Sequence, residues 1–395
     1  MDLQTLATVL PTAISATLYT LVQSALAWSL GRRRPAPRPA VRPWISILKP
    51  VAGADDELAE NLASFAALDY PAYEIVIGAA SPEDPAVPVV RALLAAHPNL
   101  PARLVWTTPP RGDVKNPKVA QLIDLTRAAR GSVLVVSDAN VRVPRGYLSS
   151  IVDVLLRPGV GLVSSVIAGG GERTFGAALE NAQLGAGVAP AVVAAHRIFG
   201  RPITVGKSMA MRREDLARVG GWESVAGVLA EDDVLGQKFH ALGYGVELCL
   251  EPVENRNVSC SALRSIDRHA RWAKMRRAIV PSLLYAFEPL ISPFIVALAV
   301  AVVATSALSI QLCAFALALQ IVGALLAHTI LGARRPLLLA AIEPLRALAW
   351  LACWILAGVS RRVAWRGNAF VIAEGSRLVP IPPPRARIAG ARAAG

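Results

Sequence analysis

Two long stretches without charged side chains constrain the fold of this chain most. Residues 3–31 contain no Asp, Glu, Lys or Arg, and neither does the stretch from Pro289 to Ala333. A helix of roughly 20 apolar residues crosses the hydrocarbon core of a bilayer. We therefore expect one membrane anchor near the N-terminus. The second stretch is far too long for one span, so it predicts a hairpin of two helices of about 20 residues each, with a turn at residues 305–309.

Basic residues that follow these stretches indicate their orientation. Arg32 to Arg34 follow the first stretch, and Arg334 with Arg335 follow the second. Cytoplasmic flanks of membrane helices carry an excess of Lys and Arg, whereas a cleaved signal peptide has its basic residues before the apolar run. We therefore expect a retained anchor in a multi-pass protein of the cell (inner) membrane, with the polar part of the chain in the cytoplasm.

A third apolar stretch, from Leu337 to Val359, is interrupted by Glu343, Pro344 and Arg346. Charged groups inside a bilayer are costly. A span at this place would also put the basic residues that follow it outside the cytoplasm. The pattern therefore favours a helix that lies in the membrane interface, and a third span with a buried ion pair is the alternative.

The net charge of +13 invites comparison with nucleic-acid-binding proteins. Many of the basic residues, however, are Arg beside the apolar stretches, where membrane topology explains them. The sequence has no basic stripe interleaved with aromatic residues. We therefore expect no nucleic acid among the partners. The four cysteines lack metal-ligand spacing and fit a reducing compartment without disulfides.

Between the membrane stretches, short apolar runs alternate with amphipathic ones. This alternation predicts an α/β fold in which a mostly parallel sheet is flanked by helices. The predicted strands are residues 44–48, 73–79, 103–107 and 133–137, and the predicted helices between them are residues 55–68, 85–97 and 117–130.

The sequence thus predicts five parts. They are an N-terminal transmembrane anchor at residues 1–31, a basic Pro-rich linker at 32–43, an α/β domain at 44–280, a C-terminal membrane region at 281–360 and a basic cytoplasmic tail at 361–395.

Polar residues mark a candidate site in the α/β domain. Ligands of parallel sheets bind beyond the carboxyl ends of the strands. Asp84 follows the second predicted strand, and Asp138 with Asn140 follows the fourth. The other candidates are Asp232, between two acidic neighbours, and Arg268, Arg271 and Trp272, just before the membrane hairpin.

Each candidate alone has an ordinary structural explanation. An Asp after a strand often caps a helix, an acidic run is often a solvated turn, and Arg with Trp near a membrane often anchors at the headgroups. Together, these residue types suit the transfer of a sugar from a nucleotide diphosphate. Asp84 can bind the base and ribose, and Asp138 with Asn140 can bind Mg²⁺ or Mn²⁺ through hard oxygen atoms. Asp232 can act as general base, and the arginines match diphosphate geometry.

In this order and at these intervals, the motifs resemble those of the inverting glycosyltransferases that include ceramide glucosyltransferases and related bacterial lipid glycosyltransferases. That family carries three ordered aspartates and a (Gln/Arg)-x-x-Arg-Trp motif on a GT-A fold. Here these are Asp84, Asp138, Asp232 and the run Arg268-His-Ala-Arg271-Trp272. The resemblance covers roughly residues 44–377, and it also includes residues 46–50, 68–71, 116–118, 206–209 and 365–367.

The resemblance implies a role for each residue of the signature. Asp84 would bind uridine, Asp138 the divalent cation, and Asp232 would be the catalytic base. The remaining implied contacts are Lys118 at the phosphates, and Arg268, Arg271 and Trp272 around the diphosphate and the acceptor.

Several positions depart from the family pattern, among them Ala120 and Gln121, where members often have Asn. Asn140 stands at the second metal position, where the family has an acid, and Ala189 precedes Pro190, where animal members have His. These departures concern the acceptor more than the reaction type. Arg at position 268, rather than Gln, points to the ceramide-type branch.

The expected function is transfer of a sugar, glucose in the first instance, from a UDP-sugar to a lipid hydroxyl such as that of ceramide, with inversion at the anomeric carbon. Three alternatives stay open. The first is a sister enzyme that glycosylates a hopanoid or another polyprenoid lipid, which an Ala- and Arg-rich, bacterial-type composition allows. The second is a non-catalytic membrane scaffold that kept the fold. The third is a processive polysaccharide synthase, which would normally have more membrane spans.

Overall fold

The computed structural model describes residues 2–32, 42–365 and 368–381. Most of the predicted linker, residues 33–41, lies outside the described residues, as do residues 366–367 and 382–395 of the predicted tail.

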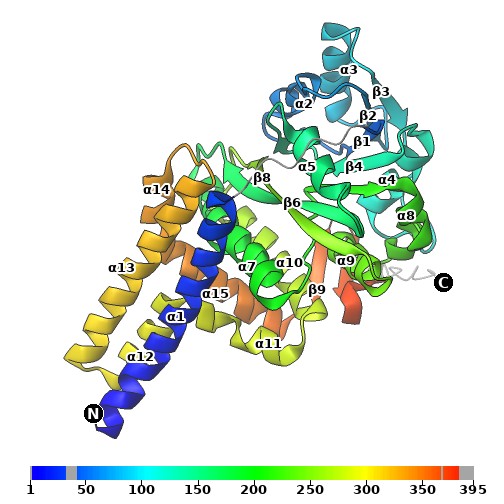
Figure 1. Ribbon diagram of the computed structural model, residues 1–395. Coiled ribbons are helices and arrows are strands. Elements are labelled where there is room, and N and C mark those ends of the chain that lie inside the picture. Colours follow the sequence, from blue (N-terminus) through cyan, green and yellow to red (C-terminus); the bar gives the residue numbers. More distant parts are fainter. Residues whose placement is uncertain (1, 33–41, 366–367, 382–395) are drawn as a thin grey trace, which may run out of the picture.

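The centre of the structure is an eight-stranded sheet with the order β3-β2-β1-β4-β7-β6-β8-β5 (Figure 1). β3, β2, β1 and β4 are parallel, β6 is parallel to β8, and β7 and β5 run antiparallel to their neighbours. The predicted fold class, with its mostly parallel sheet, is confirmed. The strands are β1 Ile45–Pro50, β2 Tyr73–Ala79, β3 Ala102–Trp106, β4 Val133–Ser137, β5 Val141–Arg142, β6 Val160–Gly170, β7 Ser208–Arg212 and β8 Gly245–Arg256.

Helices connect and cover these strands. The π-helix Gln183–Val188 joins α6 to α7. The helices of this part are α2 Leu58–Ala66, α3 Ala86–Ala96, α4 Pro117–Ala128, α5 Tyr147–Leu155, α6 Phe175–Ala182, α7 Ala189–Phe199, α8 Arg213–Arg218, α9 Glu231–Ala241 and α10 Ala262–Ile279.

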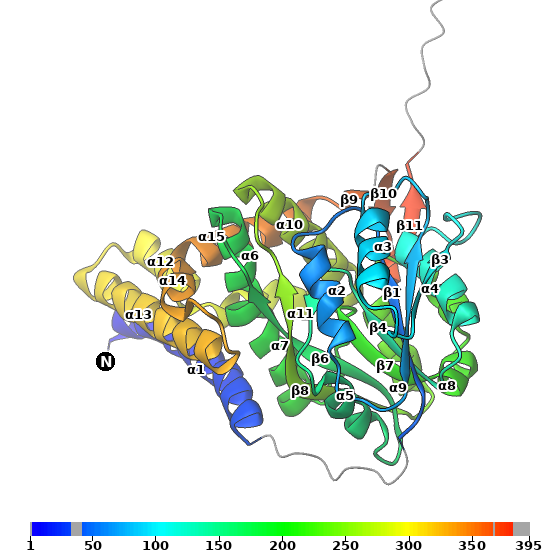
Figure 2. The ribbon, with the colours of Figure 1, turned by 90° about the horizontal axis from the view of Figure 1, so that it is seen from above.

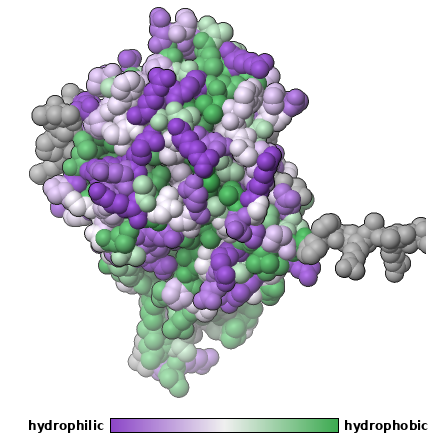
Figure 3. Space-filling model, turned by 90° about the vertical axis from the view of Figure 1, so that its right-hand side faces the viewer, coloured by the Kyte–Doolittle hydropathy of each residue, from purple (hydrophilic) through white to green (hydrophobic). Residues whose placement is uncertain are grey.

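Apolar helices from both ends of the chain pack together beside this domain (Figures 1 and 2). They are α1 Leu3–Gly31, α12 Pro293–Ala304 and α13 Ala307–Ile330. Among the described residues, α1 and α13 are long and apolar enough to cross a membrane. Figure 3 shows hydrophobic side chains on the part that projects below the domain, whereas the domain above it is mixed in character.

The hairpin of α12 and α13 turns at Thr305 and Ser306, where Ser306 caps α13. α12 has 12 residues, fewer than the length of about 20 that the sequence predicts for a span. The reason is a break at Ser292, where the helices of residues 282–291 and α12 meet at an angle of 84°. A proline disfavours helical backbone at the residue that precedes it. Ser292 precedes Pro293 and has an extended backbone.

The third apolar stretch forms two helices, α14 Pro336–Ala341 and α15 Glu343–Val359. The interrupting charges pair with each other, because the Arg346 guanidinium donates to the Glu343 carboxylate at 2.6 and 2.7 Å. Both side chains are buried, and Gln320 of α13 also donates to Glu343 at 2.8 Å. Burial of this pair inside the protein removes the cost of exposing it to lipid.

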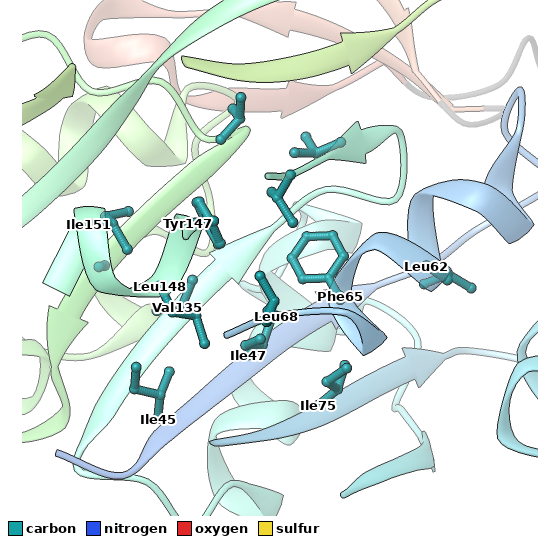
Figure 4. Packing of buried hydrophobic residues seen from close by; sticks show 14 of the residues in the cluster. Ile45, Ile47, Leu62, Phe65, Leu68, Ile75, Val135, Tyr147, Leu148 and Ile151 are labelled. Atoms are coloured by element: carbon teal, nitrogen blue, oxygen red, sulfur yellow. The ribbon is translucent and has the colours of Figure 1, made fainter. Parts of the chain in front are cut away.

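The core of the domain lies on both faces of the sheet, since successive side chains of a strand point to opposite faces. On β1, Ile45 and Ile47 pack with Phe65 of α2 and Tyr147 of α5 (Figure 4). Leu48 packs on the other side, with residues of α4 and α9. Packing on both faces thus fixes the position of the central strands and of their carboxyl ends.

A small second sheet follows the last apolar helix. Its strands are β9 Arg362–Trp365, β10 Asn368–Ile372 and β11 Leu378–Pro380, in the order β11-β10-β9, and all its pairs are antiparallel.

Candidate functional site

Three loops at the carboxyl edge of the sheet bring the candidate residues together. Asp138 directly follows β4, and Lys118 lies in the first turn of α4, which Asn116 caps through its side-chain oxygen. Asp232 lies in the first turn of α9, which follows the loop after β7 and α8. β3, β2, β1 and β4 are parallel, so the segments that follow β3 and β4 reach the same edge.

Two lysines bind the Asp138 carboxylate. The Lys118 ammonium lies 2.9 Å from Oδ1, and the Lys207 ammonium lies 3.1 Å from Oδ2. Burial by itself would raise the pKa of Asp138, but the two ammonium groups lower it well below its usual range. Lys207 also donates to Oδ1 of Asn140 at 3.0 Å. Asp138 is therefore ionised, and positive charge surrounds it.

A third lysine, Lys49 of β1, lies fully buried behind Asp138. Its ammonium donates to the Asp138 carbonyl at 2.7 Å and lies 3.8 Å from the centre of the Phe65 ring. Burial lowers the pKa of Lys49 to about 7, against the opposing effect of Asp138. Sequence reasoning assigned no role to Lys49 or Lys207. Two features of the sequence could have indicated a role for them. Lys is rare in this Arg-rich chain, and both lysines lie in segments that resemble the family.

Asp232 lies in a different electrostatic environment. Burial and, after it, the charge of the neighbouring Glu231 raise its pKa to about 7, although Lys118 opposes the rise. Its Oδ2 accepts the N–H of Gly206 at 2.6 Å, and the Gly206 carbonyl accepts from Lys118 at 2.9 Å. A carboxylate with a pKa near neutrality is suited to accept a proton in the reaction.

The two acidic neighbours of Asp232 differ from it. Glu231 is buried and pairs with Lys118 at 3.1 Å, and it accepts from Asn116 at 3.1 Å. Burial raises the pKa of Asp233 as well, while the charge of Arg201 lowers it. Glu231 is thus a structural partner of Lys118.

Gly206 permits this close arrangement. A Cβ atom at this position would lie 2.8 Å from Oδ2 of Asp232 and 3.0 Å from Nζ of Lys118. Any larger residue would therefore displace one of the two charged groups.

Asp84 has contacts that organise the backbone. Its Oδ1 accepts the N–H of Gly53 and the N–H of Ala86, both at 2.9 Å. Ala86 is the first residue of α3, so the carboxylate joins the start of this helix to the loop after β1. Uridine binding by Asp84 stays a prediction.

The Arg-x-x-Arg-Trp motif lies on α10. Arg268 pairs with Glu180 of α6 and donates to Oδ1 of Asn257 at 3.1 Å. The Trp272 ring meets the His269 ring edge-on, with 5.3 Å between the centres, and also packs against the core. Arg271 lies one turn beyond Arg268 on the same helix.

A polar cavity of about 80 Å³ lies between α10 and the loop that follows β1. Asn140 and Arg268 both line it, so the structure brings these two predicted residues to one cavity. Asp232 and Lys118 do not line it. The other lining residues are Ala54, Asp55, Asp56, Glu180, Arg256, Asn257, Ser259, Cys260 and Arg264.

The predicted cation would have few protein ligands here. Within the described ranges, no group of three or more His, Cys, Asp or Glu residues could hold a metal. Asp138 and Asn140 offer a carboxylate and an amide oxygen. Mg²⁺ is commonly bound by one or two carboxylates together with phosphate oxygens of the substrate, so this donor set fits a cation that arrives with a diphosphate.

Comparison with known proteins identifies the family. The family described as Glycosyl transferase family 21 matches residues 8–378. The chain belongs to glycosyl transferase family 21. This confirms the family and the enzyme class that the sequence motifs predict.

Two curated relatives of this family 21 protein are from Caenorhabditis elegans. Ceramide glucosyltransferase 1 is 30% identical over 249 residues, which cover 63% of this chain and 53% of the relative. Ceramide glucosyltransferase 3 is 27% identical over 346 residues, which cover 86% of this chain and 74% of the relative. The chain thus spans about half the length of the first relative and about three quarters of the second.

The family 21 chain also resembles solved structures. The mannosyltransferase PcManGT from Pyrobaculum calidifontis, in complex with GDP-Man and Mn²⁺, aligns with a TM-score of 0.49 at 23% identity. The alignment covers 88% of this chain and 98% of that one. Glucosyl-3-phosphoglycerate synthase from Mycobacterium tuberculosis aligns with a TM-score of 0.37 at 20% identity, over 58% of this chain and 76% of that one.

Proposed function

We propose that this protein transfers a sugar from a UDP-sugar to a lipid hydroxyl, with glucose as the sugar and ceramide as the acceptor. The observation that carries the proposal is the half-buried Asp232, with a pKa of about 7, beside the ionised cluster of Asp138, Lys118 and Lys207. One carboxylate is poised to accept a proton, and the adjacent cations are suited to a leaving diphosphate. The names of the curated relatives support the choice of glucose and ceramide.

The proposed reaction is one displacement. The lipid hydroxyl oxygen attacks the anomeric carbon while Asp232 takes the hydroxyl proton. The bond from the anomeric carbon to the diphosphate breaks, and UDP leaves with the electron pair. Because the attack comes from the face opposite the leaving group, the configuration inverts.

The residues around Asp138 stabilise the leaving group. Lys118 and Lys207 place two positive charges at the strand edge, and these charges suit the negative diphosphate oxygens. Asp138 and Asn140 would hold a divalent cation, which supplies charge that offsets the developing negative charge on the diphosphate. We further propose that Arg271 and Trp272 lie toward the diphosphate and the acceptor.

The apolar helices support a lipid acceptor and a membrane location. α10 carries the Arg-x-x-Arg-Trp motif and leads into α11 Ser282–Phe287 and then α12, so the motif lies close in the chain to the apolar bundle. A lipid held by the bilayer would present only its headgroup to the domain, which limits its orientations and favours reaction. We propose that the domain lies on the cytoplasmic side of the membrane.

The test is transfer by the purified full-length protein. The protein in lipid nanodiscs is incubated with each of several UDP-sugars and with ceramide, or with a hopanoid in place of ceramide, and the products are identified by mass spectrometry. We expect a glucosylated ceramide, and NMR of the product should show the anomeric configuration opposite to that of the donor. Transfer to the hopanoid alone would reassign the acceptor. Binding of UDP without transfer to any lipid would contradict the proposal and favour a scaffold.

A further inference from the structure

The small C-terminal sheet pairs with the loop that precedes α9. The N–H of Leu378 donates to the Gly227 carbonyl at 2.8 Å, and the N–H of Leu229 donates to the Ser376 carbonyl at 2.8 Å. Between these bonds, Val228 and Arg377 form an antiparallel bridge. The end of the described chain therefore adds a short strand-like segment to the loop.

Ser376 makes one further contact with this loop. Its hydroxyl oxygen accepts the N–H of Ala230 at 3.0 Å, across 146 residues of sequence. Ala230 immediately precedes α9, and Asp232 lies in the first turn of that helix. Both Ser376 and Ala230 are buried. A buried N–H without a partner is costly, so Ser376 fixes the start of α9.

Residues at the N-terminus of α4 contact the other side of the loop that precedes α9. The side-chain nitrogen of Asn116 donates to the Val228 carbonyl at 2.9 Å and to Glu231 at 3.1 Å. The Ala226 carbonyl accepts the N–H groups of Lys115 and Asn116. The loop thus lies between the N-terminus of α4, which carries Lys118, and the C-terminal sheet.

The C-terminal sheet is itself anchored to the motif helix. Val363, Phe370 and Ile372 form an apolar cluster with Leu229 of the loop, and Met275 of α10 packs against it. Lys274 of α10 donates to the Arg362 carbonyl at 2.8 Å. β9 begins a few residues after α15 ends, and Figures 1 and 2 show it near α10.

We propose that the C-terminal sheet is a positioning element for Asp232, and that Ser376 is its positioning residue. The inference rests on the proposed function and deepens it. The sheet connects the first turn of α9 to α10 and, through the chain, to α15. It thereby holds the carboxylate at the N–H of Gly206 while the acceptor reacts.

The backbone of Ser376 allows a clean substitution. Its φ angle is +63°, a region that glycine adopts without strain. Ser376→Gly therefore removes the hydroxyl without straining the backbone. The control is Val379→Ala, because Val379 lies in the same sheet at β11 but is half exposed and has no described contact with the loop.

The experiment measures amide hydrogen exchange and kinetics on the full-length protein. In S376G, exchange at residues 228–235 should become faster, while the thermal midpoint stays close to that of the parent. The kcat should fall about tenfold, within the loss of up to about 100-fold that a 1 Å misplacement causes. The KM for the UDP-sugar should change by less than about twofold, since the binding residues are intact. V379A should resemble the parent in both measurements.

Two results would overturn the inference. Unchanged exchange at residues 228–235 in S376G would show that Ser376 does not hold the loop, whether or not the protein is active. Faster exchange with an unchanged kcat would show that the contact is only structural. An inactive parent, by contrast, would refute the proposed function, and the exchange data would still report on the loop.

Discussion

At the scale of single residues, the site separates two aspartates by their surroundings. Asp138 lies between two ammonium groups, which lower its pKa. The half-buried Asp232 has its pKa raised to about 7, first by loss of solvent and then by the charge of Glu231. Groups whose environments move their pKa values apart are suited to different roles. Asp138 stays a charged ligand, whereas Asp232 can exchange a proton near neutral pH.

The first prediction concerns Asp232. Asp232→Asn should lower kcat by about 100-fold or more, in line with the roughly 10²–10⁴-fold contribution of general base catalysis, while UDP binding measured by calorimetry stays close to that of the parent. Glu231→Gln and Asp233→Asn should lower kcat less. If Asp233→Asn is inactive and Asp232→Asn still turns over, the base is Asp233.

The second prediction follows from the pKa of Asp232. Only the ionised carboxylate accepts a proton, so kcat should be high above pH 7 and fall as the pH decreases through about 7. Folding raises this pKa, so stability is lost as the pH rises from the unfolded value of about 4 toward 7. Asp232→Asn should therefore match or exceed the thermal midpoint of the parent at pH 8. A kcat that does not change between pH 5 and 8 would exclude this base.

At the scale of elements, the carboxyl edge of the sheet is where separate segments become one site. Asp138 directly follows β4, the N-terminus of α4 brings Lys118, and the turn before β7 brings Lys207 and Gly206. Parallel strands place the loops that follow them at one edge. The order and direction of the strands therefore bring these residues together.

The third prediction tests the cation at this edge. Asp138→Ala should abolish transfer, because it removes the carboxylate that both lysines bind and that would hold the cation. A chelator of divalent ions should inhibit the parent, and Mg²⁺ or Mn²⁺ should restore it; transfer is measured with and without each ion. Full activity in excess chelator would leave Lys118, Lys207 and the arginines as the cations that stabilise UDP.

At the scale of the whole molecule, helices from the two ends of the chain form one apolar bundle beside the α/β domain (Figure 2). Tyr19 of α1 donates to the Gln320 carbonyl of α13 at 2.8 Å, and Ser15 donates to the Leu290 carbonyl at 2.6 Å. Such hydrogen bonds between helices are typical of packing inside a membrane. The bundle thus joins the N-terminal anchor to the hairpin.

The fourth prediction concerns membrane topology. In a protein with its four native cysteines replaced, single cysteines at Gly31, Ala307 and Ala333 are labelled with an impermeant thiol reagent in intact cells. Ala307, next to the turn of the hairpin, should react, and Gly31 and Ala333, beside the arginine clusters, should react only after the membrane is opened. Labelling of Gly31 in intact cells would place the domain on the opposite side.

Local patterns in the sequence determined the elements of the domain. The predicted strands 73–79 and 133–137 have the bounds of β2 and β4, because runs of Val, Ile and Leu buried on both faces form parallel strands in any such sheet. The placement of Asp138 at a strand end followed from the same local pattern. The helix break at Ser292 also has a local cause, because Pro293 disfavours helical backbone at the residue before it. The composition of the stretch alone predicted a longer helix.

Tertiary structure decided what surrounds each candidate residue. Asp138 meets Lys207, Arg268 meets Glu180, and Ala230 meets Ser376, all through contacts between segments far apart in the chain. No spacing rule encodes such contacts, because they depend on the order of strands and on the packing of helices across the sheet. The raised pKa of Asp232 has the same origin, since burial by distant segments is its largest cause. The sequence alone predicted candidate carboxylates from their residue type and order, and the fold decided which charged groups surround each of them.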